Sequence, residues 1–303
     1  MKVGNRIIEI THPDKIMFSD PTITKKEVID YYHAIAKYMV PFLKDRVLTV
    51  QAFPEGVMHQ GFYQKNVQSH YPSWIPTITI DKKDGGSTQY AIGINQAELV
   101  YLANQNCVVF HPWLSRVDKL DFPDKIVFDL DPSIDDFSAV QHAALVAKHV
   151  LEECGLVPFV MTTGSRGMHV VTPLRRLYTF EQVSDIARII AERIVSYDPQ
   201  TFTVEIRKDA RKSKVFIDSL RNNSGATAVC PYSLRPRPGA PVATPITWAQ
   251  ATDKTLTSQQ YNLYTVGHKL KKDGCAWKDF KRYAQTLAKA CRALNTKMTD
   301  RIN

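Results

Sequence analysis

The chain has 303 residues, enough to bury a substantial core as one large domain or two modest ones. Lys and Arg number 39 against 30 Asp and Glu, and the resulting net charge of +9 favours a polyanionic partner such as nucleic acid. The five cysteines are scattered and never spaced as Cys-x-x-Cys, so neither a disulfide framework nor a structural zinc site is predicted. The sequence contains no signal-peptide pattern and no apolar run of about 18 residues. These features predict a soluble cytoplasmic protein that contacts no membrane.

The first third of the sequence predicts two helices among several short strands. Thr24 and Glu27 form a capping-box pattern that begins a helix, which we expect to end near Val40, before Pro41. The strands predicted after it are 47–53, 57–64, 75–80 and 88–94, with a hairpin at Lys83-Asp84-Gly85-Gly86, and 107–110. Asn95 is expected to cap a short second helix that ends near Asn104.

The stretch Lys125-Ile126-Val127-Phe128-Asp129-Leu130-Asp131-Pro132 predicts a strand that presents paired acids. Alternate side chains of a strand share a face, so the Cα atoms of Asp129 and Asp131 lie about 6 to 7 Å apart on one side. Pro132 cannot continue a central ladder. Like charges on one face repel unless a cation lies between them, and oxygen ligands suit Mg²⁺ or Mn²⁺. A divalent metal site is one interpretation; solvated acids, or a turn capped by Asp131, are the other.

Two later stretches carry groups that suit phosphate. In Thr163-Gly164-Ser165-Arg166-Gly167-Met168-His169, the glycines allow a tight turn with exposed amides, and Arg166 adds positive charge. A plain glycine-rich hairpin is the alternative. The basic run 207–214 leads directly into a strand, Val215-Phe216-Ile217-Asp218, that ends in a third acid.

The remaining elements expected are a helix from Asp136 to Cys154, strands at 157–162 and 203–206, a helix at 180–195, an extended Arg235-Pro236-Arg237-Pro238 segment, and a basic helix from Trp277 to about Leu294.

Three motifs together resemble those of the archaeo-eukaryotic primase superfamily, and most closely the polymerase domain of bacterial DNA ligase D. They are 127–132, 162–170 and 215–222. The resemblance covers the whole chain, and the further segments that carry it are Asp14-Lys15, Thr24-Lys25, Asp30-Tyr31-Tyr32, Tyr63-Gln64-Lys65-Asn66, His111-Pro112-Trp113 and Tyr232-Ser233-Leu234-Arg235-Pro236-Arg237-Pro238-Gly239-Ala240-Pro241-Val242.

The resemblance implies a role for each candidate residue. Asp129, Asp131 and Asp218 would be the catalytic acids that hold two Mn²⁺ or Mg²⁺ ions. The nucleotide would be bound by His111, Thr163, Arg166, His169, Arg221, Arg235 and Arg237. On DNA, Lys15 and Lys25 would bind a 5′-phosphate, Phe62 or Tyr63 would stack near the templating base, and Lys65 would add a further contact. Relatives commonly have a basic residue where this chain has Gln51-Ala52, so one phosphate contact is expected to be missing.

The fold that the resemblance implies is α/β (α+β), with a mixed central sheet carrying the three acids, flanked by helices, and a β-rich N-terminal portion. We expect a single primase-polymerase domain over 1–303, with an N-terminal portion at 1–115 and a catalytic core at 116–303 that ends in a helix. No stretch after Leu294 predicts a ligase or nuclease, so a free-standing polymerase and an excised domain both stay open.

The function implied is template-directed addition of nucleotides, with ribonucleotides preferred, to a 3′-OH at double-strand breaks or short gaps that carry a 5′-phosphate, in non-homologous end joining. The partners implied are such DNA, ribonucleoside or deoxyribonucleoside triphosphates, a separate DNA ligase and a Ku-like end-binding protein, in the nucleoid-containing cytoplasm. The alternatives are a primase that starts chains de novo, a metal-dependent nuclease, and a catalytically weak break-end-binding module.

Overall fold

The computed structural model describes residues 1–82, 85–93 and 95–296. The chain forms two compact units, each built from several segments. Unit 1 contains residues 1–118, 227–244 and 261–274, and unit 2 contains 119–226, 245–260 and the chain from 275 onward. Within the described residues, no helix is both long enough and apolar enough to cross a membrane.

Unit 2 is built on a six-strand sheet in the order β13-β14-β10-β12-β11-β15. The pairs β14–β10, β10–β12 and β12–β11 are antiparallel and β13–β14 is parallel, which confirms the expected mixed sheet. The strands are β10 (Lys125–Pro132), β11 (Phe159–Thr162), β12 (Met168–Pro173), β13 (Phe202–Thr203), β14 (Val215–Asp218) and β15 (Thr244–Ile246).

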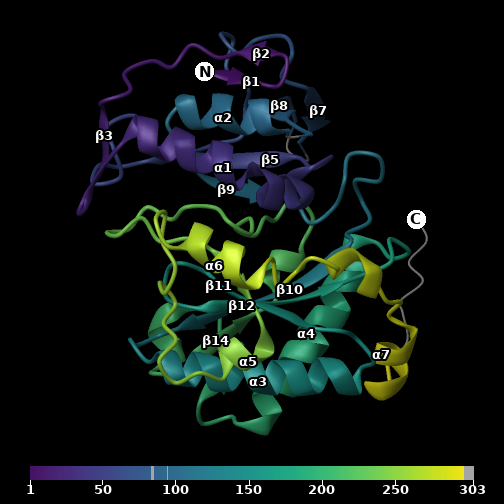
Figure 1. Ribbon diagram of the computed structural model, residues 1–303. Coiled ribbons are helices and arrows are strands. Elements are labelled where there is room, and N and C mark those ends of the chain that lie inside the picture. The colour runs from purple at the N-terminus through teal and green to yellow at the C-terminus, as the bar shows by residue number, and fades with distance from the viewer. Residues whose placement is uncertain (83–84, 94, 297–303) are drawn as a thin grey trace. The chain divides into compact units, whose positions relative to one another are not determined.

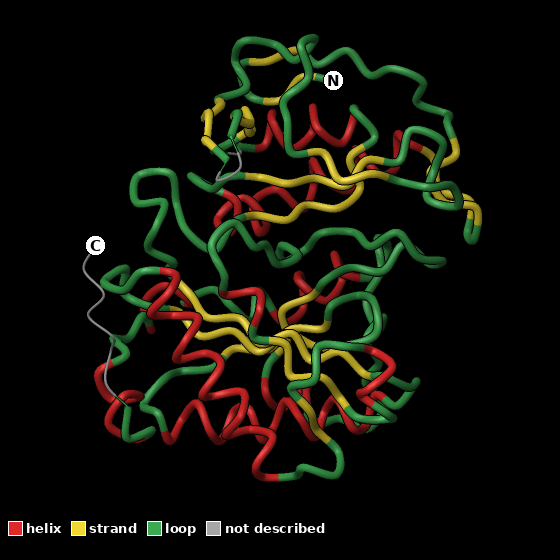
Figure 2. The backbone as a smooth tube through the Cα atoms, turned by 180° about the vertical axis from the view of Figure 1, so that it is seen from behind, coloured by secondary structure: helices red, strands yellow, loops and turns green. Residues whose placement is uncertain are grey.

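Helices α3 (Phe137–Glu153) and α4 (Phe180–Tyr197) pack against each other and against β10 on one side of this sheet (Figures 1 and 2). The pattern of β10 explains the packing, because Ile126, Phe128 and Leu130 alternate along the strand and are all buried. The opposite face of β10 therefore carries Asp129 and Asp131. The shorter elements of unit 2 are η1 (Lys208–Arg211), η2 (Leu220–Asn222), α5 (Trp248–Ala251), η3 (Phe280–Tyr283) and α7 (Ala288–Ala293).

Unit 1 combines a three-strand antiparallel sheet, β6-β5-β9, with two helices that pack on each other. Both helices begin with capping boxes. Thr24 with Glu27 is the predicted one, and Asn95, predicted as a cap, forms the second with Glu98. The elements of this unit are β1 (Lys2–Val3), β2 (Arg6–Ile7), β3 (Ile16–Ser19), β4 (Thr22–Thr24), α1 (Lys25–Leu43), β5 (Leu48–Ala52), β6 (Phe62–Gln64), β7 (Thr77–Asp81), β8 (Ser87–Ala91), α2 (Gln96–Asn104), β9 (Cys107–Pro112) and α6 (Val266–Asp273). Strands β7 and β8 form the predicted hairpin, although its residues Lys83 and Asp84 lie outside the described residues.

Three predicted elements of the N-terminal half and the core have different ends in the structure. Helix α1 passes through Pro41 and ends at Leu43, because Pro41 lies in the last turn and Leu43 is buried in the core. Of the strand predicted at 57–64, only β6 is a strand. The residues before it form turns closed by hydrogen bonds such as that from His59 N to Gly56 O. The strand predicted at 203–206 ends at Thr203, beyond which carbonyl groups bind the Arg211 side chain instead of a neighbouring strand.

The single helix predicted from Trp277 to about Leu294 is wrong. Trp277 is buried, and its indole Nε1 donates a hydrogen bond to the Val160 carbonyl at 3.0 Å. Further along, Gln285 forms an isolated bridge with Leu174, and the backbone can make that bridge only by leaving the helical path. Because this segment packs on β11 and beside the end of β12, it forms two short helices, η3 and α7, instead of one long helix.

Candidate active site

A row of polar side chains crosses three neighbouring strands of the sheet in unit 2. In the antiparallel register, Asp129 of β10 lies opposite His169 of β12 on one side and opposite Asp218 of β14 on the other. Directly opposed residues in antiparallel strands point to the same face. Asp131 lies two residues further along β10 and so points to this face as well. The three acids predicted from sequence are thus carried by two adjacent strands.

Asp129 is surrounded by basic groups. Its Oδ1 lies 3.4 Å from His169 Nε2, and its Oδ2 accepts a hydrogen bond from Arg221 Nη2 at 3.1 Å. Burial opposes ionisation most strongly, but His169 and Arg221 together hold the pKa of Asp129 well below its ordinary value. Asp129 is therefore a carboxylate at neutral pH.

Asp218 lies in a less favourable environment than Asp129. Burial, followed by the negative charge of Asp129, raises the pKa of Asp218 above its ordinary value, and Arg221 Nε at 3.6 Å from Oδ2 only partly offsets this. Asp129 is thus held in its charged form, and its negative charge makes ionisation of Asp218 less favourable. Such a pair is stabilised by any cation that binds both groups.

Asp131 is held by two arginines from different segments. Arg166 Nη2 donates to Oδ1 at 2.8 Å, and Arg211 Nη1 donates to Oδ2 at 3.4 Å. Arg211 is itself buried, lies 3.9 Å from the Phe216 ring centroid, and donates to two loop carbonyls. The sequence pattern predicts only a basic run around Arg211. No sequence signal separates Arg211 from the other basic residues of that run.

The donor set of this face fits a hard divalent cation, because Asp129, Asp131 and Asp218 offer carboxylate oxygens and no thiolate. Across the described part of the chain, no group of three or more His, Cys, Asp or Glu side chains is arranged as a metal-ligand cluster. Asp131 is instead paired with Arg166 and Arg211. Asp129 and Asp218 are therefore the pair that fits a metal most directly.

The predicted anion-binding turn between β11 and β12 is tight, but several of its amides are already occupied. Thr163 Oγ1 accepts hydrogen bonds from the amides of Ser165 and Gly167, both at 3.3 Å, and the Gly164 amide donates to Ser258. The expectation that these amides are exposed for an anion is therefore wrong. Among the turn's side chains, Arg166 carries the charge, while Thr163 holds the turn closed.

Asn222 fixes the end of the acid-bearing strand, a role that sequence reasoning missed. Its Oδ1 accepts from the Val127 amide and its Nδ2 donates to the Val127 carbonyl, both at 2.8 Å. The backbone of β14 pairs with β10 from Asp129 to Pro132, so the Asn222 side chain continues the ladder where β14 has ended. Neither composition nor periodicity indicates that a side chain will take the place of a neighbouring strand in this way.

The other predicted nucleotide and template residues belong to unit 1. Tyr63 and Phe62 on β6 are 62% and 49% exposed, and the Tyr63 ring centroid lies 5.8 Å from that of His111 on β9. Lys65 follows β6 and is exposed. Both aromatic side chains are therefore available for stacking, and the structure places Tyr63 beside a predicted nucleotide-binding residue.

The arginines at 235 and 237 lie in a turn rather than in the extended segment predicted. The Arg237 amide donates to the Arg235 carbonyl at 2.9 Å, and the Ala240 amide donates to the Arg237 carbonyl at 3.1 Å. Ala240 has a positive φ of 46°, which lets the chain reverse despite the two prolines. Both arginine side chains are half-buried.

Lys15 and Lys25, the predicted phosphate-binding residues, meet at the start of α1. The Lys25 amide donates to the Lys15 carbonyl at 2.7 Å, and the Lys26 amide donates to the Pro13 carbonyl at 2.9 Å. Thr24 Oγ1 accepts from the Glu27 amide. The first amides of α1 are thus occupied, so an anion bound here would be held by the ammonium groups rather than by helix amides.

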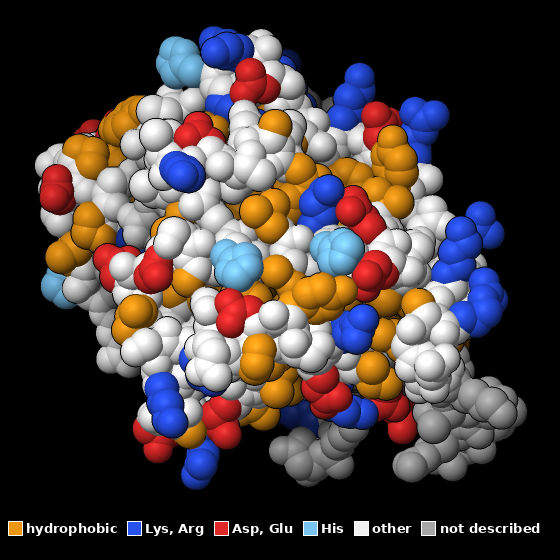
Figure 3. Space-filling model, turned by 90° about the horizontal axis from the view of Figure 1, so that it is seen from below, with side chains coloured by type: hydrophobic (Ala, Val, Ile, Leu, Met, Phe, Trp, Pro, Cys, Tyr) orange, Lys and Arg blue, Asp and Glu red, His pale blue; other side chains and the backbone are white. Residues whose placement is uncertain are grey.

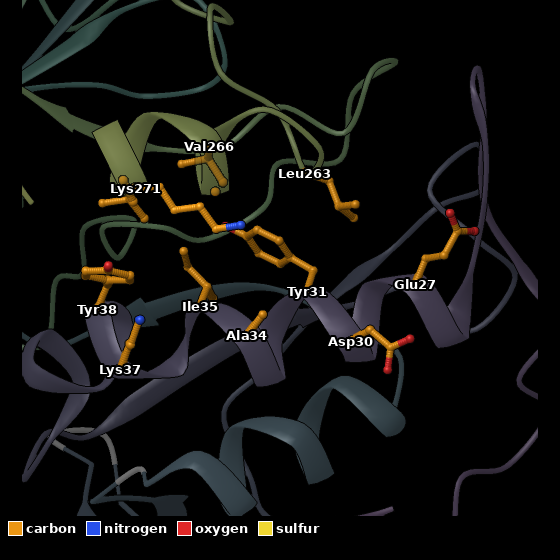
Figure 4. Close-up of a pocket in the computed structure, with 12 residues that line it drawn as sticks. Glu27, Asp30, Tyr31, Ala34, Ile35, Lys37, Tyr38, Leu263, Val266 and Lys271 are labelled. Carbon is orange, nitrogen blue, oxygen red and sulfur yellow. The ribbon is translucent and has the colours of Figure 1, made fainter. Parts of the chain in front are cut away.

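A pocket of about 450 Å³ lies in unit 1 between α1 and α6 (Figure 4). Its walls are mainly apolar, with Tyr31 and Ile35 from α1 facing Val266 from α6. None of the residues predicted to bind metal, nucleotide or DNA lines it.

Comparison with known proteins identifies the class of protein. Residues 24–277 match the family model described as LigD, primase-polymerase domain. The structure is similar to the polymerase domain of Mycobacterium tuberculosis ligase D, solved in complex with DNA, with a TM-score of 0.87 and 28% identity over 92% of this chain and 99% of that one.

Two relatives extend the comparison to whole proteins. The bifunctional non-homologous end joining protein LigD of Bacillus subtilis is 32% identical over 280 residues, 92% of this chain and 45% of the relative. The multifunctional non-homologous end joining protein LigD of Mycolicibacterium smegmatis is 31% identical over 261 residues, 84% of this chain and 34% of the relative. The chain thus spans less than half the length of these relatives.

The fold, with its acid-bearing mixed sheet, is that of a primase-polymerase domain, a class that transfers nucleotidyl groups and requires a divalent metal. This chain belongs to the LigD primase-polymerase family.

Proposed function

We propose that the chain adds nucleotides, with ribonucleotides preferred, to a DNA 3′-OH opposite a template at double-strand breaks or short gaps bearing a 5′-phosphate. We further propose that it acts in non-homologous end joining in the cytoplasm, with a separate DNA ligase and a Ku-like end-binding protein as partners. In this proposal both units serve one primase-polymerase domain. The observation that carries it is the opposition of Asp129 and Asp218 on adjacent strands, with Asp131 on the same face.

The three acids would hold two Mn²⁺ or Mg²⁺ ions, which when bound activate the attacking oxygen and offset charge on the leaving group. Their oxygen donors fit these cations. Burial first, and then the negative charge of Asp129, raises the pKa of Asp218, and a bound cation would offset that charge. Nucleotidyl transfer of this kind needs no side-chain nucleophile. The acids therefore act by binding and positioning.

The basic side chains near the acids would bind the triphosphate. Arg166 and Arg221 carry planar guanidinium groups that suit phosphate oxygens. His169 lies in the same row as the acids and would orient Asp129 or a phosphate. The other residues that we propose to bind the nucleotide are His111, Arg235 and Arg237. Thr163 would shape the turn that carries Arg166.

On the DNA side, Lys15 and Lys25 would bind the 5′-phosphate. Lys25 is 2% exposed, and burial, with the charge of Lys15 adding to it, lowers its pKa. Among the described residues, no Asp or Glu forms an ion pair with Lys25. A buried ammonium group beside a second one favours an anion at this place. Phe62 or Tyr63 would stack on the template base, and Lys65 would add a further contact to DNA.

The test is primer extension with Mn²⁺ and ribonucleoside or deoxyribonucleoside triphosphates on a primed template, beside the same template without primer. We expect extension of the primed template, faster with ribonucleotides, and no product from the unprimed one. Products of equal yield from the unprimed template would make the chain a primase. DNA binding without any nucleotide addition would make it an end-binding module.

A further inference from the structure

The Lys25 ammonium group is oriented by a hydroxyl from outside its helix. Lys25 is the first residue of α1, and its Nζ donates a hydrogen bond to Thr11 Oγ1 at 3.0 Å. Thr11 is exposed, so the buried ammonium lies directly beneath a surface residue. An ammonium group has three N–H donors, and this bond uses one of them. The hydrogen bond to Thr11 therefore fixes the position of Lys25 Nζ, and with it the directions in which the two remaining N–H groups can point.

The Thr11 hydroxyl is itself oriented by Asn104, the last residue of α2. Asn104 Oδ1 accepts hydrogen bonds from the Thr11 amide at 3.1 Å and from Thr11 Oγ1 at 3.4 Å. A hydroxyl has one hydrogen and two lone pairs. Because Asn104 takes the hydrogen, the lone pairs of Thr11 Oγ1 remain to accept from Lys25. The bonds therefore run in one direction, from Lys25 to Thr11 to Asn104.

Asn104 is held in turn by a hydrogen bond to the backbone. Its Nδ2 donates to the Glu9 carbonyl at 2.8 Å, and the residue is 4% exposed. The amide orientation is thus determined, with Nδ2 facing a carbonyl and Oδ1 facing two donors. Helix α2, which ends at Asn104, packs on α1, which begins at Lys25.

We propose that Asn104, acting through Thr11, is a positioning residue that aims the Lys25 ammonium group at a terminal phosphate bound jointly with Lys15. The inference rests on the proposed phosphate site and adds the residues that preorganise it. Lys15 is held separately, since its Nζ donates to the Pro54 carbonyl. Each ammonium group is thus anchored by one uncharged acceptor, which leaves its positive charge available to the phosphate.

The test compares affinities for two gapped DNAs that differ only in a 5′-phosphate or a 5′-hydroxyl at the downstream end. Thr11→Val removes the hydroxyl but keeps the hydrogen bond from the Thr11 backbone N–H to Asn104 Oδ1. Asn104→Leu removes the Oδ1 acceptor itself. Each should lower the preference for the phosphorylated DNA by about 2- to 10-fold, the effect of one hydrogen bond. Thr11→Ser, which keeps the hydroxyl, should restore the wild-type preference.

The ratio of the two affinities separates positioning from folding, because general destabilisation lowers both affinities together. Thr79→Val, at an exposed threonine of β7, is the matched control and should leave the ratio unchanged. If Lys25→Ala removes the preference while Thr11→Val and Asn104→Leu keep it, the positioning role is overturned and the phosphate site stands. Equal affinity of the wild-type protein for both DNAs overturns the phosphate site and the positioning role together.

Discussion

Single residues set the charge balance at the acid-bearing face of unit 2. Asp129 and Asp218 face each other across β10 and β14, yet the pKa of Asp129 is lowered and that of Asp218 is raised. Burial opposes ionisation of both groups. At Asp129 the neighbouring His169 and Arg221 outweigh it and lower the pKa, whereas at Asp218 burial and the negative charge of Asp129 prevail and raise the pKa. The face is therefore built to keep one carboxylate charged while the other gains most from an added cation.

Arg235 provides a residue-scale prediction that separates nucleotide binding from DNA binding. Arg235→Ala should lower kcat/KM for the nucleotide about 10- to 100-fold, the effect of losing a hydrogen bond to a charged group. The affinity for primer-template, measured by fluorescence anisotropy, should stay within about 2-fold, a change well under 1 kcal/mol.

Arg188→Ala is the control for that prediction, because Arg188 pairs with Glu192 on the exposed face of α4. It should alter neither quantity. A loss of DNA affinity in Arg235→Ala with unchanged nucleotide kinetics would instead assign the turn at 235–240 to the DNA path.

At the scale of secondary-structure elements, the acid-bearing strand depends on a close approach of the backbone at Gly167. A Cβ atom added at Gly167 would lie 2.0 Å from the Leu130 carbonyl oxygen, between Asp129 and Asp131. Only glycine allows the turn after β11 to pass so near β10. The same contact brings Arg166 within reach of Asp131.

Gly167→Ala should therefore lower the free energy of unfolding by about 1 to 3 kcal/mol, as overpacking does, and reduce extension activity because β10 must move. Gly267→Ala is the matched control, since a Cβ there meets no atom within 4 Å and the residue lies in α6. It should leave stability unchanged or raise it by up to about 1 kcal/mol. Thermal melting followed by circular dichroism compares the two, and equal melting temperatures would contradict the close approach.

Local signals predicted most elements, and tertiary packing decided those that were missed. The capping box at Thr24 predicted the start of α1, Asn95 predicted the start of α2, and the alternation around Asp129 predicted β10. The region after Trp277 was predicted as one helix because its polar and apolar spacing is helical, but burial of Trp277 overrides that spacing. Contacts that join distant segments, such as Asn222 to Val127, leave no periodic trace in a sequence.

The same limit applies to the candidate site. The paired acids of β10 and the acid that ends β14 could be found from spacing, because strand geometry fixes their faces. Arg211 and Thr11 could not, because each acts through one contact to a residue far away in sequence. The exposed turn amides were mispredicted because the Thr163 hydroxyl binds them first.

At the scale of the whole molecule, the net charge of +9 suits a nucleic-acid partner without showing where it binds. On the face that Figure 3 shows, acidic and basic side chains are interspersed rather than gathered into one basic patch. We expect the affinity for DNA to depend on particular sites such as Lys15 and Lys25 as well as on overall charge.

Gapped DNA with a 5′-phosphate should bind roughly 5- to 30-fold tighter than the hydroxyl form, because charge-assisted bonds to the phosphate are added. The preference should shrink as salt rises, since counterions compete for the same charges. Replacing Lys15 and Lys25 together with Ala should abolish it, whereas Lys148→Ala, at a lysine of α3 paired with Glu152, should not. A preference that survives the double substitution would place the phosphate elsewhere.

The central claim, that the acids of β10 bind the metal used in nucleotidyl transfer, is tested most directly by primer extension with Asp129→Asn and Asp131→Asn. Both substitutions keep the shape of the side chain and remove its charge. We predict that each lowers extension with Mn²⁺ by more than about 100-fold, a loss above roughly 2.7 kcal/mol of transition-state stabilisation, while primer-template affinity stays near the wild-type value. Retention of more than about a tenth of the wild-type rate in either variant, a loss below roughly 1.4 kcal/mol, would contradict the claim.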